Sequence, residues 1–273
     1  MRQVIHKEFT FDASHRLVNL KKSAEWNKEV YGKCNNKPSH GHTFRMVVEL
    51  SGEINNDTGF IVNFVDLKRM VNELIIEKLD HHFINEVDFM KGKLCTCENL
   101  VEEVWKILND YLISNKADYY LKELVIYETT TSSIMEKVEE TELAWVAEFI
   151  DGDGTILLSK RAGRIEIYNT NLEALNKAKQ ILGSRDLKRD YIYSNKGFPR
   201  RKPGYHTTIN KQTLLKHTLI KILPYLVEKR EQGKILLEYL NLRKKHPRFS
   251  LKEKKKLSSL VKRMKAVNQR GRK

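Results

Sequence analysis

The excess positive charge of this 273-residue chain is confined to its second half. Residues 1–136 carry 17 Lys and Arg against 21 Asp and Glu, a balance of −4. The other residues carry the remaining 33 of 50 basic and 14 of 35 acidic side chains, a balance of +19. Apolar residues recur at regular spacing through this basic half, which predicts a folded domain rather than a solubilising tail. The sequence therefore predicts two domains, 1–136 and 137–273, and a polyanionic partner for the second alone.

Cysteine usage and hydropathy narrow the class of protein further. An apolar fraction of 40% supports true hydrophobic cores. Cys34, Cys95 and Cys97 are too few for a disulfide framework. No stretch approaches the ~20 uncharged apolar residues of a membrane span, and the N-terminus lacks the apolar block of a secretion signal. We expect a reduced, cytoplasmic protein with no membrane partner.

The first half reads as mixed strands and helices. Apolar residues alternate with period two over 2–11 and 42–51, and a compact apolar run covers 121–127, which predicts three strands. Helical spacing predicts helices over 65–79 and 98–114. The hydroxyl-rich and charged stretch 129–142 has no clear pattern, so we place the domain boundary within it, near 136–141.

The second half begins with an apolar helix, 143–150, that is expected to stop at an Asp-Gly-Asp-Gly stretch. The remaining elements follow the same periodicity rules. They are strands over 155–159, 164–168 and 205–210, helices over 172–182, 212–222, 225–243 and 251–266, and an exposed loop or hairpin over 196–204.

Three histidines are candidate ligands of one metal ion. His40 and His42 are two residues apart at the start of a predicted strand, so their imidazoles leave the same face. His15 ends another strand-like segment. Three neutral nitrogens would leave zinc one open position, as in a catalytic site. On spacing alone, ordinary surface or core histidines are the more frequent explanation.

Further polar residues surround these histidines in the sequence. Cys34 stands six residues before His40. Asp80 adjoins His81 at the end of a predicted helix, and a carboxylate beside an imidazole can orient it and raise its basicity. The segment 96–99 opens the next predicted helix, and Glu128 closes the last strand.

Over residues 3–135 the sequence resembles the 6-pyruvoyl-tetrahydropterin synthases and the related 6-carboxy-tetrahydropterin synthases of deazapurine (queuosine) biosynthesis. Six motifs match in order: 11–17 (Phe-Asp-Ala-Ser-His-Arg-Leu), Cys34 to His42, 59–68, 79–85 (Leu-Asp-His-His-Phe-Ile-Asn), Thr96 to Asn99, and 127–129 (Tyr-Glu-Thr).

This resemblance implies an α+β T-fold, a four-stranded antiparallel sheet with two helices on one face, assembled as a ring-shaped homo-oligomer. It implies zinc held by the three histidines. Cys34 would be the general base, with Asp80 and His81 as a partnered proton relay. One departure is Cys95-Thr96 in place of the usual Pro-Thr; with Cys97 next, a second thiol lies near the pocket, and we read it as structural.

The resemblance also implies the substrate, 7,8-dihydroneopterin triphosphate. Glu128 would anchor the pterin ring, and Thr96 and Glu98 would also contact the substrate. Zinc would bind the side-chain hydroxyls and acidify the neighbouring C–H bonds. The product is 6-pyruvoyl-tetrahydropterin in one branch and 6-carboxy-tetrahydropterin in the other. Asp80 to Asn85 favours the carboxy branch, whereas the five-residue spacer between Cys34 and His40 favours the pyruvoyl branch. We prefer the carboxy product.

A second motif lies at the start of the basic half. Leu143 to Gly154 (Leu-Ala-Trp-Val-Ala-Glu-Phe-Ile-Asp-Gly-Asp-Gly) is an apolar helix ending in carboxylates and glycines. A simple turn is the alternative reading, while the spaced acids of an EF-hand calcium loop are missing. The segment resembles the LAGLIDADG motif of homing endonucleases, in which two such helices pack closely and bring two acids to their base. The resemblance covers about 141–266.

That resemblance implies an α+β domain whose sheet forms a saddle on double-stranded DNA. Asp153 would bind Mg²⁺, and Lys229 would lie near the scissile phosphate. The residues that we expect to contact phosphates are Lys196, Arg200, Arg201 and Lys202. A single motif requires a homodimer for cleavage. Glu148 replaces the usual small glycine of the motif, which puts activity in more doubt than fold.

Three interpretations remain open at this point. The leading one is a fused chain with an active pterin synthase and an endonuclease-like module. In a second, the chain is only a DNA-binding or DNA-cleaving protein whose pterin domain supports assembly. In a third, the enzyme is active and the basic half binds DNA without cutting it.

Overall fold

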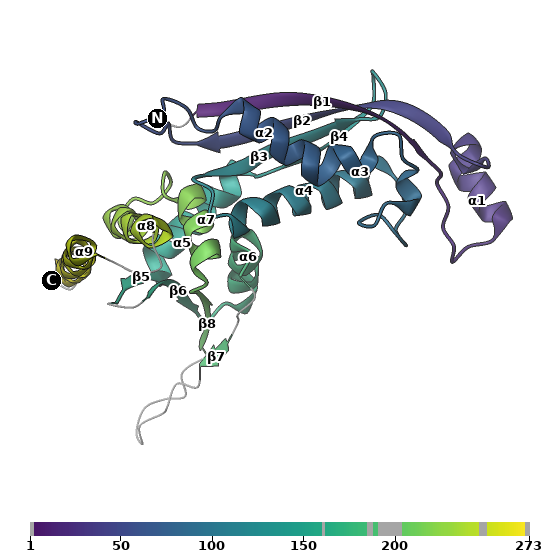
Figure 1. The fold of residues 1–273 in the computed structure, drawn as a ribbon. Coiled ribbons are helices and arrows are strands. Elements are labelled where there is room, and N and C mark those ends of the chain that lie inside the picture. Colours follow the sequence, from purple (N-terminus) through teal and green to yellow (C-terminus); the bar gives the residue numbers. More distant parts are fainter. Residues whose placement is uncertain (1–2, 160–161, 185–187, 191–203, 246–249, 271–273) are drawn as a thin grey trace, which may run out of the picture. The chain divides into compact units, whose positions relative to one another are not determined.

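The computed structural model describes residues 3–159, 162–184, 188–190, 204–245 and 250–270. These residues form two compact units (Figure 1). The N-terminal unit comprises Met1–Leu112 and Ala117–Val138, and the C-terminal unit comprises Ile113–Lys116 and Glu139–Lys273. Within the described residues, no helix is both long and apolar enough to cross a membrane.

The N-terminal unit is built on one antiparallel sheet of four strands in the order β1-β2-β3-β4. The strands are β1 (Gln3–His15), β2 (His40–Gly52), β3 (Tyr119–Tyr127) and β4 (Ser133–Lys137). The helices are α1 (Ala24–Tyr31), α2 (Phe64–Val71), α3 (Glu77–Leu79) and α4 (Cys97–Ser114). Single 3₁₀ turns lie at Gly32–Asn35 and Ile84–Glu86.

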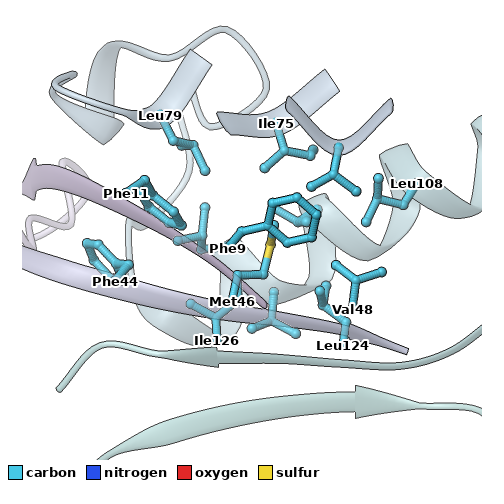
Figure 2. Close-up of a cluster of buried hydrophobic side chains, with 14 of the residues drawn as sticks. Phe9, Phe11, Phe44, Met46, Val48, Ile75, Leu79, Leu108, Leu124 and Ile126 are labelled. Carbon is cyan, nitrogen blue, oxygen red and sulfur yellow. The ribbon is translucent and has the colours of Figure 1, made fainter. Parts of the chain in front are cut away.

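One face of this sheet packs against the helices. Alternate residues of β1 and β2 point inward, among them Phe9, Phe11, Phe44 and Met46. Side chains of α2, α3, α4 and the π turn between α2 and α3 close the core from the other side, as Figure 2 shows for Ile75, Leu79 and Leu108. Each such side chain contributes about 1.5–3 kcal/mol by leaving water. The predicted four-stranded antiparallel sheet with helices on one face is confirmed.

Three features of this unit differ from the expected elements. The predicted helix over 65–79 is interrupted by a π turn at Asn72–Ile76. The stretch 129–142, expected to be irregular, contains β4, an edge strand paired with β3. Helix α1 was not expected; its N-cap is Ser23, whose hydroxyl accepts the N–H of Trp26 at 3.2 Å.

The C-terminal unit has a second antiparallel sheet, in the order β5-β6-β8-β7. Its strands are β5 (Gly154–Leu158), β6 (Gly163–Asn169), β7 (Lys188–Asp190) and β8 (Gly204–Ile209). Its helices are α5 (Glu140–Asp153), α6 (Leu172–Leu182), α7 (Gln212–Ile222), α8 (Arg230–Lys245) and α9 (Leu251–Arg270).

Helices α5, α6, α7 and α8 contact strands of this sheet, and the residues of β6 alternate between buried and more exposed positions. Ile156, Ile165 and Ile167 are buried toward the helices. On the alternate positions Arg164 pairs with Glu166 at 2.8 Å, and the rings of Tyr168 and His206 lie 5.2 Å apart. A sheet with one apolar and one polar face suits a surface that binds a polar partner.

Two boundaries in this unit differ from the sequence predictions. Helix α5 runs through Asp151 and Gly152 to Asp153 and is capped by Gly154, where a Cβ would lie 2.7 Å from the carbonyl oxygen of Ile150. Helix α8 begins at Arg230 rather than at residue 225. Both differences come from contacts at the base of α5, described below.

Candidate metal centre and flanking pockets

The register of β1 and β2 brings the three predicted ligands together. His15 is paired with His40, and Ala13 is paired with His42. All three imidazoles therefore project from the core-facing side of the sheet, at one end of the β1–β2 ladder. Each histidine offers a ring nitrogen, and these nitrogens lie within 4.8 Å of one another. The pairing of β1 with β2 therefore brings His15 next to His40, although the two residues are 25 positions apart in the sequence.

Backbone contacts fix the tautomer of His15. The side chain is 2% exposed, and its Nδ1 lies 2.7 Å from the carbonyl oxygen of Cys95. A carbonyl oxygen only accepts, so Nδ1 carries a proton, and Nε2 is the ring nitrogen that faces the other two histidines. Metal-binding histidines are commonly held in this way.

The donor set suits a metal ion such as zinc. Glu128 Oε1 lies 3.1 Å from Nε2 of His15 and 3.8 Å from Nε2 of His42. Apart from this carboxylate, the described part of the chain offers no partner to three buried ring atoms, His15 Nε2, His40 Nδ1 and His42 Nε2. Buried nitrogens without partners are costly, and three that converge are what a zinc ion requires.

Electrostatics favour the ligand forms of these groups. Burial, together with the neighbouring imidazoles, lowers the pKa of His40. Burial likewise lowers the pKa of His42, against the opposing effect of Glu128. The contact with His15 is the main cause of a lowered pKa at Glu128. His40 and His42 therefore favour the neutral form, and Glu128 favours the ionised form.

Cys34 lies in the 3₁₀ turn Gly32–Asn35 and is half-buried. Its carbonyl oxygen accepts the N–H of Leu17 at 2.9 Å, which ties this turn to the chain just beyond His15. The other two thiols are buried. Burial raises the pKa of Cys95 to about 11 and, with nearby Glu128 and Glu98, the pKa of Cys97 to about 12. Cys34 is therefore the most exposed of the three thiols.

Asp80 and His81 lie on the edge of β1 that faces away from β2. Asp80 Oδ1 accepts the N–H of Asp12 at 2.9 Å, and His81 N–H donates to the carbonyl oxygen of Asp12 at 2.6 Å. Asp80 Oδ2 is 3.8 Å from Nε2 of His81. His81 has φ +58°, a left-handed conformation that costs a non-glycine residue about 1–3 kcal/mol. In the described residues no hydrogen bond or ion pair joins Cys34 to Asp80 or to His81.

A pocket of about 510 Å³ contains the three predicted substrate contacts, Thr96, Glu98 and Glu128. Thr96 also caps α4, since its hydroxyl accepts the N–H of Asn99 at 3.4 Å. The pocket is lined in addition by Thr131, Ser132 and Ser133. Its volume suits a small heterocycle, and its polar lining provides hydrogen bonds that would orient one.

Sequence reasoning missed some of these residues. Asp12 holds both Asp80 and Thr43, whose hydroxyl donates to Asp12 Oδ1 at 2.6 Å. Asn85 accepts the N–H of Arg16 at 2.9 Å and donates to its carbonyl oxygen at 2.8 Å. Asp12 and Asn85 stand inside the matched motifs, which is a signal that could have found them. The hydroxyl run 131–133 carried no such signal.

Asp151 and Asp153, at the C-terminal end of α5, make different contacts. Asp151 accepts the backbone N–H groups of residues 227–229 at 2.6, 3.2 and 2.8 Å, and Lys229 Nζ donates to the Asp151 carbonyl oxygen. Asp151 is thus structural and sets the start of α8. Asp153 Oδ2 accepts only from Asn169 Nδ2 among the hydrogen bonds of the described residues, at 2.6 Å.

The structure describes only some of the residues that were predicted to contact DNA or to bind magnesium. Lys196, Arg200, Arg201 and Lys202 lie outside the described residues. Lys229 lies beside Asp151 rather than Asp153. Among the described residues, converging groups of three or more His, Cys, Asp or Glu are the three histidines and Asp12-Asp80-His81, and neither contains Asp153.

Comparisons with known proteins concern mainly the N-terminal unit. The family model for 6-pyruvoyl tetrahydropterin synthase matches residues 4–139. The 6-pyruvoyl tetrahydrobiopterin synthase of Homo sapiens is 34% identical over 136 residues, covering 50% of this chain and 91% of the human protein. The solved structure of the Caenorhabditis elegans 6-pyruvoyl tetrahydropterin synthase is 28% identical with a TM-score of 0.46, covering 51% of this chain and 97% of that one.

A solved homing endonuclease, I-CvuI in complex with its target, also aligns with the chain. It is 22% identical with a TM-score of 0.36, and the alignment covers 47% of this chain and 82% of that one. This likeness is too low to identify the C-terminal unit.

Proposed function

Because the chain belongs, through residues 4–139, to the 6-pyruvoyl tetrahydropterin synthase family, we propose that its N-terminal unit is a zinc-dependent lyase acting on 7,8-dihydroneopterin triphosphate. The observation that carries this proposal is the convergence of one buried ring nitrogen from each of three histidines beside a polar pocket.

The residues present fit zinc by number and chemistry. His15 is oriented by the Cys95 carbonyl group, and the ring atoms of His40 and His42 are buried without another partner in the described chain. When bound, zinc supplies Lewis acidity that lowers the pKa of hydroxyls and of the C–H bonds beside them. Three protein ligands leave a position open for the substrate.

The chain's own residues bind the ring and move protons. Glu128, Thr96 and Glu98 line one pocket and would accept N–H donors of the pterin. Cys34, half-buried near the end of β1, would take a proton from the substrate side chain. Asp80, whose Oδ2 lies 3.8 Å from Nε2 of His81, would orient that imidazole, and His81 would return a proton to the substrate.

We further propose that the synthase works as a homo-oligomer. Cys34 lies beyond the end of β1, whereas Asp80 and His81 lie on its open edge, and no hydrogen bond or ion pair joins them in the part of the chain described. We infer that neighbouring copies of the chain supply these three groups jointly to one substrate.

The test is incubation of the full chain with zinc and 7,8-dihydroneopterin triphosphate, with products identified by mass spectrometry. Release of triphosphate with 6-pyruvoyl-tetrahydropterin would match the activity named for the human relative. Acetaldehyde with 6-carboxy-tetrahydropterin would support the branch that the segment Asp80 to Asn85 favours. Bound zinc without either product would overturn the enzymatic proposal and leave the pterin domain as an assembly scaffold.

For the C-terminal unit we propose a LAGLIDADG-type domain that binds double-stranded DNA. The supporting observation is the base of α5: Asp151 is engaged in structure, whereas Asp153 hydrogen-bonds only Asn169 in the described residues. Asp153 could then share Mg²⁺ with its counterpart in a homodimer, with Lys229 as a nearby cation. The +19 balance of 137–273 favours a polyanionic partner.

DNA affinity measured against salt concentration tests binding. Each phosphate contact contributes about −0.9 to the slope of log K against log salt, so a slope near zero would remove the proposal. Replacing Arg200 and Arg201 together by Ala should reduce the slope by about 2 units. Cleavage is tested separately with Mg²⁺; binding without nicking would favour a non-cleaving domain.

A further inference from the structure

The last helix, α9, carries much of the positive charge of the C-terminal unit. Its 20 residues contain eight basic side chains and one acidic side chain, a balance of +7. Residues 137–273 have a balance of +19, so this helix supplies more than a third of the excess. The residues proposed above to contact DNA lie elsewhere, in 196–202 and at the base of α5, and they leave the charge of α9 unexplained.

One side of α9 packs against its own unit. Leu260, Val261 and Met264 are buried, and the helix contacts α8 and the edge strand β5 (Figure 1). Asn268 Nδ2 donates to the carbonyl oxygen of Ile156 in β5 at 3.5 Å. A basic helix that binds a membrane surface inserts its apolar side into the bilayer, and here that side is already covered. The packing therefore favours a polyanion in solution as the partner of the charges.

Nearby acids compensate only the start of α9 and one of its flanks. Glu253, the single acid of the helix, accepts the N–H of Ser250 at 2.8 Å, and its own N–H donates to Ser250 Oγ at 3.3 Å. This reciprocal pair is a capping box. On the flank that faces α8, Glu238 lies 3.3 Å from Lys256 Nζ and 3.2 Å from the guanidinium of Arg263.

Four exposed lysines on another side of α9 are not compensated. With about 3.6 residues per turn they fall within an arc of about 100°, away from the buried residues and from the paired flank. Within the described residues, no hydrogen bond or ion pair engages any of them. The first and last are about 16 Å apart along the helix axis. We call these residues the lysine face: Lys254, Lys255, Lys262 and Lys265.

The charge pattern of the lysine face differs from that of a merely solvated helix. Solvated helices commonly mix acids and bases, because like charges one turn apart repel each other by roughly 0.2–0.5 kcal/mol. Lys262 and Lys265 are one turn apart, and no acid of α9 separates the charges of this face. An external anion would relieve the repulsion. A DNA duplex carries one negative charge per ~1.7 Å of its axis, so a surface of this length can meet several phosphates at once.

We propose that the lysine face of α9 binds the phosphate backbone of double-stranded DNA, as a second contact surface beside the sheet. This inference rests on the proposed DNA-binding function of the C-terminal unit. It assigns the four lysines to affinity and not to sequence recognition, because phosphate contacts carry no base information. The contacts have a fixed geometry, since α9 is anchored on α8 and on β5.

The test compares the full wild-type chain with the variant Lys254→Gln/Lys255→Gln/Lys262→Gln/Lys265→Gln. Affinity for a duplex of several helical turns is measured between ~50 and ~200 mM salt. We expect the slope of log K against log salt to lose about 3 units and the affinity to fall at least about tenfold, because each lost phosphate contact removes about 0.9 from the slope. Glutamine retains helix propensity, so the thermal unfolding of the variant should be unchanged.

Two controls are matched to this variant. Within α9, Lys255→Gln should reduce the slope by about 0.9, whereas Lys256→Gln, at the adjacent position that is paired with Glu238, should change it by less than half as much. The second control removes the same total charge from exposed helix positions of the N-terminal unit and should leave the slope unchanged: Lys28→Gln, Lys68→Gln, Lys78→Gln and Lys106→Gln.

The outcomes distinguish this proposal from the proposed function. Equal slopes and affinities in the wild-type chain and the four-lysine variant would overturn the lysine face and leave DNA binding intact. No salt-dependent duplex binding by the wild-type chain would overturn both. A loss confined to single-stranded DNA, to duplex RNA or to vesicles of anionic lipid would also overturn the proposal, because the lysine face would then bind another partner.

A second measurement decides the proposal if the variant unfolds at a lower temperature. The wild-type chain is acetylated with and without the duplex, and modification of each lysine is measured by mass spectrometry. Protection of the lysine face by the duplex, with Lys28 and Lys68 unprotected, would support the proposal. Equal acetylation of the lysine face with and without the duplex, despite binding, would overturn it.

Discussion

His15 and His40 are partners across the β1–β2 ladder, and the centroids of their rings lie 4.5 Å apart. Separating the two residues along the strands would require a shift in the pairing register of β1 and β2. A one-residue shift would turn every core side chain of one strand outward. The ligand geometry is therefore as rigid as the hydrophobic core next to it.

Replacing His40 with Ala should remove zinc from the N-terminal unit. Losing one of three ligands should weaken zinc affinity by more than the roughly 10–100-fold typical of outer-shell changes. Metal content per chain, measured by mass spectrometry after dialysis, checks this. His6→Ala, at an exposed position of the same sheet, is the control. Equal zinc in both variants would refute the ligand assignment.

Thiol labelling should separate Cys34 from the two buried cysteines. With pKa values of about 11 and 12, Cys95 and Cys97 hold only about 10⁻³ and 10⁻⁴ of their thiols as thiolate at pH 8. Because both values are raised, their labelling should increase with pH and reach no plateau below pH 10. Intact mass after iodoacetamide should show one adduct at pH 8, none in Cys34→Ser, and three in urea. Rapid triple labelling of the folded chain would contradict the burial of these thiols.

Mixing two inactive variants should restore synthase activity if copies share a site. Cys34→Ala lacks the proposed base, and His81→Ala lacks the proposed relay. In mixed oligomers some sites would combine an intact Cys34 with an intact His81. Turnover after subunit exchange, compared with each variant alone, is the measurement. Continued inactivity, despite exchange shown by native mass spectrometry, would place all three groups within one copy.

Asp151 and Asp153 should differ in what their loss does. Asp151→Ala removes the acceptor of three backbone N–H groups and should destabilise the C-terminal unit by about 1.5–3 kcal/mol. Asp153→Asn should leave the unfolding transition in place and abolish any Mg²⁺-dependent nicking. Thermal melts and a plasmid-nicking assay, run on both variants, check the pair. A stable Asp151→Ala chain, or nicking by Asp153→Asn, would reverse the assignment.

The elements that the sequence predicts well are those with a strong internal period. Period-two alternation predicted the strand over 42–51, and β2 confirms it. The spacing of His40 and His42 predicted a shared face, because alternation alone determines which way a strand side chain points. Their proximity to His15 depends on the pairing of β1 with β2, which the family resemblance supplied.

The misses share a different physical cause. Strand β4 is mostly exposed, so it carries no apolar alternation, and only its pairing with β3 makes it a strand. The start of α8 is set by Asp151, more than 70 residues away, because that carboxylate holds the N–H groups of residues 227–229. Asn27 looked like an ordinary polar residue, and its four local hydrogen bonds appear only once the loop is folded.

The left-handed backbone of His81 sets stability against function in this chain. A glycine at that position would adopt φ +58° without strain and should raise the free energy of unfolding by about 1 kcal/mol. It would also delete the imidazole whose Nε2 lies 3.8 Å from the Asp80 carboxylate. Selection for a more heat-resistant chain should therefore find His81→Gly readily, and selection for turnover should reject it. At His81 the fold retains a strained backbone conformation for a side chain that we propose to carry a proton.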